Sequence, residues 1–148
     1  MIEEKKTFLC LTLKPLALII LIISFIGTIV NFVLYGTNSQ YTDSVRYAFI
    51  IECIIDIPLI IIGAIGIYGR KPTCVKAYGF YLLIRIFFNL VITLDFVLPT
   101  AKNVAAGGVI FGLAIRTALE LYFLYVFLTY SHELKKEKRE EKEISGLY

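Results

Sequence analysis

Apolar residues along this chain gather in four long blocks that short polar connections separate. The blocks cover residues 16–35, 45–68, 77–98 and 109–130. Each has roughly the 20 residues that an α-helix needs to cross about 30 Å of hydrocarbon. The pattern predicts an all-α integral membrane protein, folded as a four-transmembrane-helix bundle with short loops. Pro15 and Pro99 are expected at helix ends, where proline is tolerated.

Composition supports this prediction and leaves no room for a separate soluble domain. The 148 residues are 58% hydrophobic and have a mean hydropathy of +0.78, whereas soluble domains are roughly 45–50% apolar. We therefore expect one membrane domain over residues 1–148, with residues 131–148 as a charged tail. The first block is longer than the roughly 7–15 apolar residues of a signal-peptide core, so we interpret it as a membrane anchor.

Basic residues lie almost entirely on one side of the predicted spans. That side carries Lys5, Lys6, Lys14, Arg70, Lys71, Lys76, Lys135, Lys136, Lys138, Arg139 and Lys142. The other side has only Arg46 and Lys102. Because cytosolic flanks are enriched in Lys and Arg, the asymmetry predicts that both termini are cytosolic.

Charged residues inside the spans are the most informative feature of the sequence. The charged residues are Glu52, Asp56, Arg85, Asp95, Arg116 and Glu120, and the neutral polar Asn89 lies among them. Such a charge costs roughly 2.5 kcal/mol or more near the bilayer centre, so these residues normally face the bundle interior and pair. Six of them form three pairs spaced four residues apart, which places both members of each pair on one helix face. We predict an intramembrane polar network between the last three spans.

Depth along the spans predicts two adjacent charged layers. Asp56, Arg85 and Glu120 lie within about one helical turn of the midplane, and Glu52, Asn89 and Arg116 lie about one turn nearer the outside. Depth therefore pairs Arg116 with Glu52 and Arg85 with Asp56. Glu120 remains as the acid that is protonated or paired with a partner. Counting Asp95, four carboxylates face two arginines, and protonation, a bound cation, water or a partner's positive charge has to meet the surplus. Asp95 lies near the outer interface, where we expect it to be hydrated.

Small residues predict where helices approach closely. They form two strips, Gly108 and Gly112 in the fourth span and Gly63, Gly66 and Gly69 in the second. The strip in the fourth span continues at intervals of four into Arg116 and Glu120, so a neighbouring helix packed against it would bring Arg116 near its partners. In the third span, Leu82 and Phe87 are expected to face lipid.

Motifs for catalysis, metals or cofactors are absent from the sequence. No P-loop, GxSxG, HExxH or CxxC occurs, and His132 is the only histidine. We therefore expect no enzyme activity, no metal site and no cofactor, and nothing points to nucleic acid. Cys10 and Cys74 are expected at the cytosolic face, either as candidate palmitoylation sites or as inert thiols. A structural disulfide is not expected.

The general layout resembles a known group of small membrane proteins. Basic residues and a cysteine precede the first span (KKTFLCLTLKPLALIILI), and acidic residues lie inside later spans. In this the chain resembles the lysosomal-associated transmembrane protein family and similar tetraspan proteins. The resemblance implies a eukaryotic endomembrane (endosome, lysosome or Golgi) or the plasma membrane. The tail, however, lacks the PPxY and YxxΦ sorting signals that family members often carry.

These features predict a non-enzymatic protein that acts through helix–helix or lipid contacts, as a trafficking adaptor or an accessory subunit. Its expected partners are membrane lipids and other membrane proteins or a second copy of the chain. The alternative is a small transporter or an ion- or proton-conducting protein that uses the acidic cluster, although no internal repeat supports it. The tail carries five basic and five acidic residues. This balance favours a solvated helical extension over a polybasic lipid-binding patch.

Overall fold

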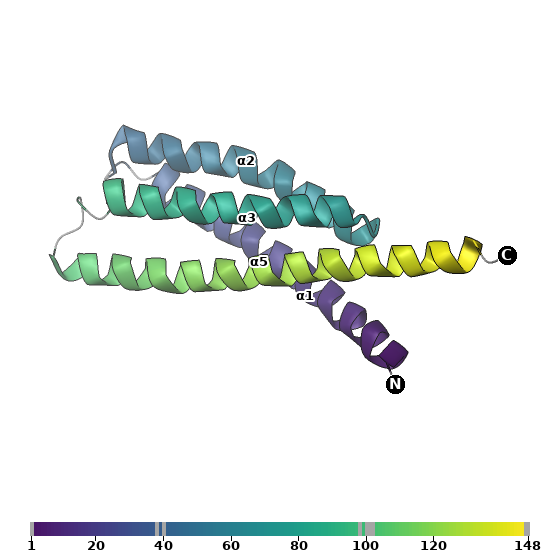
Figure 1. Ribbon diagram of the computed structural model, residues 1–148. Helices are drawn as coiled ribbons and strands as arrows, with labels where there is room; N and C mark the ends of the chain where they lie inside the picture. The colour runs from purple at the N-terminus through teal and green to yellow at the C-terminus, as the bar shows by residue number, and fades with distance from the viewer. Residues whose placement is uncertain (1, 38, 40, 98, 100–102, 147–148) are drawn as a thin grey trace.

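The computed structural model of the chain is all-helical. It describes residues 2–37, 39, 41–97, 99 and 103–146, and within these the side chains of all but 2–11, 96–97 and 103–105. The elements are α1 (Ile2–Asn31), η1 (Phe32–Gly36), α2 (Asp43–Tyr68), α3 (Pro72–Ile92), η2 (Thr93–Val97) and α5 (Asn103–Gly146). Helices α2, α3 and α5 run side by side, and α1 crosses them obliquely (Figure 1). Both chain ends and the α2–α3 turn lie at the same end of the bundle.

Four helices are long and apolar enough to cross a membrane, as predicted. They cover Thr12–Gly36, Asp43–Tyr68, Pro72–Asp95 and Ala106–Gly146. Their outward faces carry large apolar side chains, such as Ile54 at 65%, Ile84 at 65% and Phe111 at 69% exposure. Water-soluble proteins rarely expose contiguous apolar surface on this scale. These faces indicate an integral membrane protein.

The first and last helices extend beyond the predicted spans. Pro15 lies inside α1 rather than at its end, so that part of the prediction is wrong. Proline removes one backbone hydrogen bond, and near the membrane surface water can satisfy the freed carbonyl. At the other end, α5 continues without a break through the tail to Gly146, as expected for a helical extension.

The buried residues form two apolar clusters with a polar layer between them. The larger lies toward the end that holds the termini and comprises Ala17, Ile20, Leu21, Ile60, Ile67, Val75, Tyr78, Leu82, Phe123, Val126, Phe127, Tyr130 and Leu134. The smaller, at the other end, comprises Val45, Phe49 and Ile92. Leu82 is fully buried, so the prediction that it faces lipid is wrong, whereas Phe87 is 62% exposed. Leu82 precedes Arg85 by three residues and therefore shares its inward face.

Two of the predicted glycines bring helices together. A Cβ at Gly63 would lie 3.1 Å from Leu21 on α1 and 3.1 Å from Tyr78 on α3. A Cβ at Gly66 would lie 2.9 Å from the backbone nitrogen of Val75 on α3. The absence of a side chain at these positions therefore lets α2 approach its neighbours closely.

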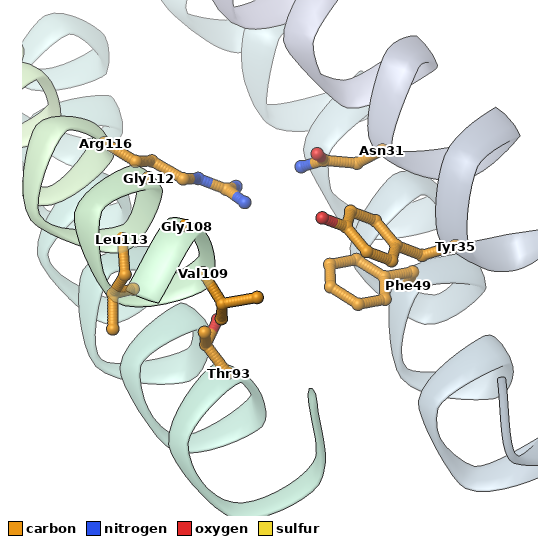
Figure 2. A pocket seen from close by; sticks show the side chains of 9 residues that line it. All are labelled: Asn31, Tyr35, Phe49, Thr93, Gly108, Val109, Gly112, Leu113 and Arg116. Carbon is orange, nitrogen blue, oxygen red and sulfur yellow. The ribbon is translucent and has the colours of Figure 1, made fainter. Parts of the chain in front are cut away.

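The remaining glycines do not pack against another helix, and the prediction is wrong for them. Gly69 ends α2, and its amide donates to the Ile65 carbonyl at 2.8 Å. A Cβ at Gly108 or Gly112 would meet no atom within 4 Å. Both glycines line an open space between α5 and α1, across which Arg116 points toward Asn31 (Figure 2).

Substituting Gly66 with alanine is expected to destabilise the protein by about 1–3 kcal/mol, because the new methyl group would overlap backbone atoms of α3. The matched control is Gly27→Ala in α1, where a Cβ meets nothing within 4 Å. There the higher helix propensity of alanine should leave stability unchanged or raise it. Thermal unfolding of both variants in detergent measures the difference. Equal unfolding midpoints would contradict the close α2–α3 contact.

Candidate functional site

One buried ion-pair cluster unites six of the seven predicted polar residues. They are Glu52 and Asp56 from α2, Arg85 and Asn89 from α3, and Arg116 and Glu120 from α5. The guanidinium of Arg85, 5% exposed, lies at the centre. Its Nε is 3.5 Å from Oε1 of Glu52 and 3.5 Å from Oε1 of Glu120, and its Nη2 is 3.5 Å from Oδ2 of Asp56. The structure therefore brings six of the seven predicted residues together.

A second arginine joins the two predicted layers into one network. Arg116 Nη2 donates to Oε1 of Glu52 at 3.2 Å, and its Nε donates to Oε1 of Glu120 at 3.2 Å. Asn89 Nδ2 also donates to Glu52 Oε1, at 3.2 Å. Glu120 is therefore not the unpaired acid that counting by depth predicts. The prediction fails because an arginine side chain is long enough to span the roughly 5.4 Å of one helical turn.

Helix α1 contributes polar groups that the charge pattern does not reveal. Thr28 Oγ1 donates to Oδ2 of Asp56 at 2.6 Å. The Asn31 amide faces Arg116, and in the amide orientation that satisfies both side chains its oxygen accepts from Arg116 Nη1 at 3.0 Å and Nη2 at 3.1 Å. A signal for this face exists in the sequence, since Ser24, Thr28 and Asn31 are spaced by four and three residues in an otherwise apolar span.

The cluster carries excess negative charge and unsatisfied acceptors. Three carboxylates contact two guanidinium groups, which leaves a formal surplus of one negative charge. Among the described atoms, Glu52 Oε2, Asp56 Oδ1 and Asn89 Oδ1 are buried without a hydrogen-bond partner. Each such group costs about 1–3 kcal/mol. Asp95 is exposed in η2, and no ion pair within the described part of the chain joins it to the cluster.

A groove between α1 and α5 leads to this cluster from the lipid-facing surface. It consists of two adjoining cavities of about 390 and 320 Å³, which share Asn31, Gly112 and Arg116 as lining residues. In the first, Arg116 faces Asn31 and the hydroxyl of Tyr35 across the open space (Figure 2). The second reaches Arg85 and Glu120. We call this feature the α1–α5 groove.

The structure describes the side chains of two of the three cysteines. Cys53 and Cys74 are free thiols, each half-buried. Cys74 lies at the α2–α3 contact, where its Cβ would be 2.9 Å from a Cβ at Gly66. The side chain of Cys10 lies outside the described residues. Within the described part of the chain, no group of three or more His, Cys, Asp or Glu is arranged to hold a metal ion.

Fold and site together describe a four-helix integral membrane protein with a buried ion-pair cluster at mid-height. Comparison of the chain with protein-family models, curated proteins and solved structures finds no match. The resemblance to the lysosomal-associated transmembrane protein family therefore rests on the span layout and the quoted segment alone.

Proposed function

We propose that this chain is a non-enzymatic membrane protein that binds other membrane components, as a trafficking adaptor or as an accessory subunit of a larger complex. It resides in an endomembrane or the plasma membrane, with both termini in the cytosol. The Lys/Arg asymmetry and the common end of the two termini support this orientation. The observation that carries the function is the α1–α5 groove, through which the cluster reaches the lipid-facing surface.

The occupant that best fits the groove is a transmembrane helix of a partner protein with a basic side chain at mid-depth. Gly27 and Gly112 line the groove and have no atom within 4 Å of a Cβ, so another helix backbone could approach closely. A lysine or arginine on that helix would offset the surplus negative charge beside Glu120. At mid-depth of the described spans, the chain's own basic residues are Arg85 and Arg116, and both are already in the cluster. A second copy therefore offers no such side chain to this groove.

Filling the groove is expected to remove the partner. In Gly112→Leu, a side chain would occupy the space shared by both cavities. The control is Gly107→Leu, at an exposed position that lines neither cavity. Purification from native membranes in mild detergent should give wild type and Gly107→Leu with a stoichiometric partner, and Gly112→Leu folded but alone. A partner retained equally by both variants, or a wild type that purifies only as a homo-oligomer, would contradict helix docking in this groove.

A small transporter is the second candidate function, and one specific observation favours it. The cluster is reached from another side by a cavity of about 240 Å³ between α2 and α3, which Glu52 and Arg85 line. Buried acceptors without partners, Glu52 Oε2 and Asp56 Oδ1, could take up a proton or cation. Flux measurements separate this candidate from the binding protein.

A further inference from the structure

The charges of the α5 tail are segregated on the helix surface although their sum is zero. Glu137 and Glu141, one turn apart, both point at Arg70 in the α2–α3 turn. Four exposed basic side chains, Lys135, Lys138, Arg139 and Lys142, fall within about 100° of arc on another face. They border one shallow cavity of about 380 Å³ together with Pro72. No carboxylate of the described tail lies within this arc, which we call the basic face.

Arg70 holds the tail in this orientation. Its Nη2 is 2.7 Å from Oε2 of Glu137 and 3.3 Å from Oε1 of Glu141. The hydrogen bond and charge of Glu137 raise the pKa of Arg70 above its ordinary value, so the contact stays charged. Because both acids face Arg70, they are turned away from the basic face.

The backbone of Arg70 adopts a conformation that normally calls for glycine. Its φ is 49°, and it follows Gly69, the residue that caps the end of α2. The Lys71 amide donates to the Gly66 carbonyl at 2.8 Å and the Arg70 amide to the Ile67 carbonyl at 3.3 Å. This is the Schellman arrangement, in which the left-handed residue is usually glycine. A non-glycine residue at such a position carries a backbone cost, which the contacts of the Arg70 side chain with Glu137 and Glu141 offset in part.

The basic face lies at the depth of lipid headgroups. Helix α2 has 26 residues, or about 39 Å, so it crosses the hydrocarbon and ends in the headgroup layer. Ser131 Oγ donates to the Pro72 carbonyl at 2.9 Å, and Arg70 contacts Glu137 and Glu141. These contacts place the start of the tail beside the α2–α3 turn, and Lys135, Lys138 and Arg139 follow within about 12 Å of Ser131 along the helix axis. The basic face therefore begins in the headgroup layer.

We propose that Lys135, Lys138, Arg139 and Lys142 form a binding site for the phosphorylated headgroup of an anionic lipid in the cytosolic leaflet. The leaflet assignment rests on the orientation in the proposed function. Clusters of this size directly beside a transmembrane helix attract anionic lipids, and each basic residue contributes about fivefold in affinity. The balanced tail composition argues against such a patch only if its charges are mixed, and the helix places these four basic residues on a face that no carboxylate of the described tail shares.

The test titrates the full chain in nonionic micelles with short-chain lipids. Phosphatidylinositol bisphosphate should bind most tightly, phosphatidylserine more weakly and phosphatidylcholine least. Lys135→Gln with Arg139→Gln should weaken binding of the bisphosphate lipid at least about tenfold. The control, Lys14→Gln with Lys76→Gln, removes the same charge on the same side of the bundle but outside the basic face, and should change binding less than about threefold. Arg70→Gly suits the backbone but frees both acids, so it should weaken binding without lowering thermal stability.

Several results would overturn the proposal. One is unchanged binding of the bisphosphate lipid in the Lys135/Arg139 variant. Another is an equal loss of binding in the Lys14/Lys76 control, because the total charge of the protein would then explain the affinity. Soluble inositol trisphosphate that binds as tightly as the lipid would identify a free polyphosphate site instead. Binding in micelles does not depend on orientation. A tag on the tail tests the orientation separately. If the tag is accessible only from outside the cell or from the organelle lumen, the assignment to the cytosolic leaflet and the proposed orientation are both wrong. The outcome of the groove experiment does not depend on this result.

Discussion

Replacing Arg85 with leucine is expected to remove most of the folded protein. Its guanidinium lies within 3.5 Å of Glu52, Asp56 and Glu120, and these carboxylates would lose their central cation. Breaking a buried pair costs about 3–5 kcal/mol in soluble proteins, a large share of a total stability of about 5–15 kcal/mol. The fraction that elutes as a single species in gel filtration, with the thermal unfolding midpoint, measures the loss.

The matched control for Arg85→Leu is Phe87→Ala on the same helix, at a 62% exposed position. It should cost little, because it changes a side chain that faces lipid. A compensated variant, Arg85→Leu with Asp56→Asn and Glu52→Gln, should recover part of the lost yield, since fewer buried charges remain unpaired. If Arg85→Leu and Phe87→Ala unfold at the same temperature, the cluster does not support the fold as described.

The fold was predictable because its strongest signals are local. Apolar runs of membrane length gave the four spans. Residues spaced by four, such as Glu52 with Asp56, identified the inward face of each helix. Counting by depth pairs Arg116 with Glu52 alone and leaves Glu120 as the protonated or partner-paired acid, because it takes no account of how far an arginine side chain reaches along the helix. Side-chain geometry in three dimensions, not sequence, decided the pairing.

Other features depended on what lies opposite a residue. Gly66 and Gly112 look equivalent in sequence, yet α3 covers the first and open space faces the second. Equal numbers of acids and bases in the tail likewise concealed its basic face, which appears only when the residues are placed around the helix. Arg70, more than sixty residues earlier in the chain, pairs with two of the acids on another face. Long-range contacts of this kind are outside the reach of periodicity and composition.

Glu120→Gln is expected to abolish helix docking while the protein stays folded. Glutamine keeps the shape and an acceptor beside Arg116, but removes the surplus negative charge at the α1–α5 groove. A leucine-rich transmembrane peptide with one central lysine serves as the probe, and an all-leucine peptide as its reference. Wild type should bind the lysine peptide more tightly. Glu120→Gln should lose about tenfold or more of this preference, the effect of one charge-assisted hydrogen bond of about 1.5–3 kcal/mol. Glu133→Gln, an equal charge change further along α5 outside the groove, should keep it.

The same variant distinguishes binding from transport. A transporter needs an acid that gains and loses its cation, so Glu120→Gln would abolish a proton- or cation-dependent flux in proteoliposomes and leave peptide binding intact. In a binding protein, the carboxylates stay in ion pairs with the arginines. Glu120 forms such ion pairs, at 3.2 Å with Arg116 and at 3.5 Å with Arg85. We therefore expect wild-type flux equal to that of empty liposomes. A clear wild-type flux that disappears in Glu120→Gln would replace the binding function with transport, because only a titrating acid explains both results.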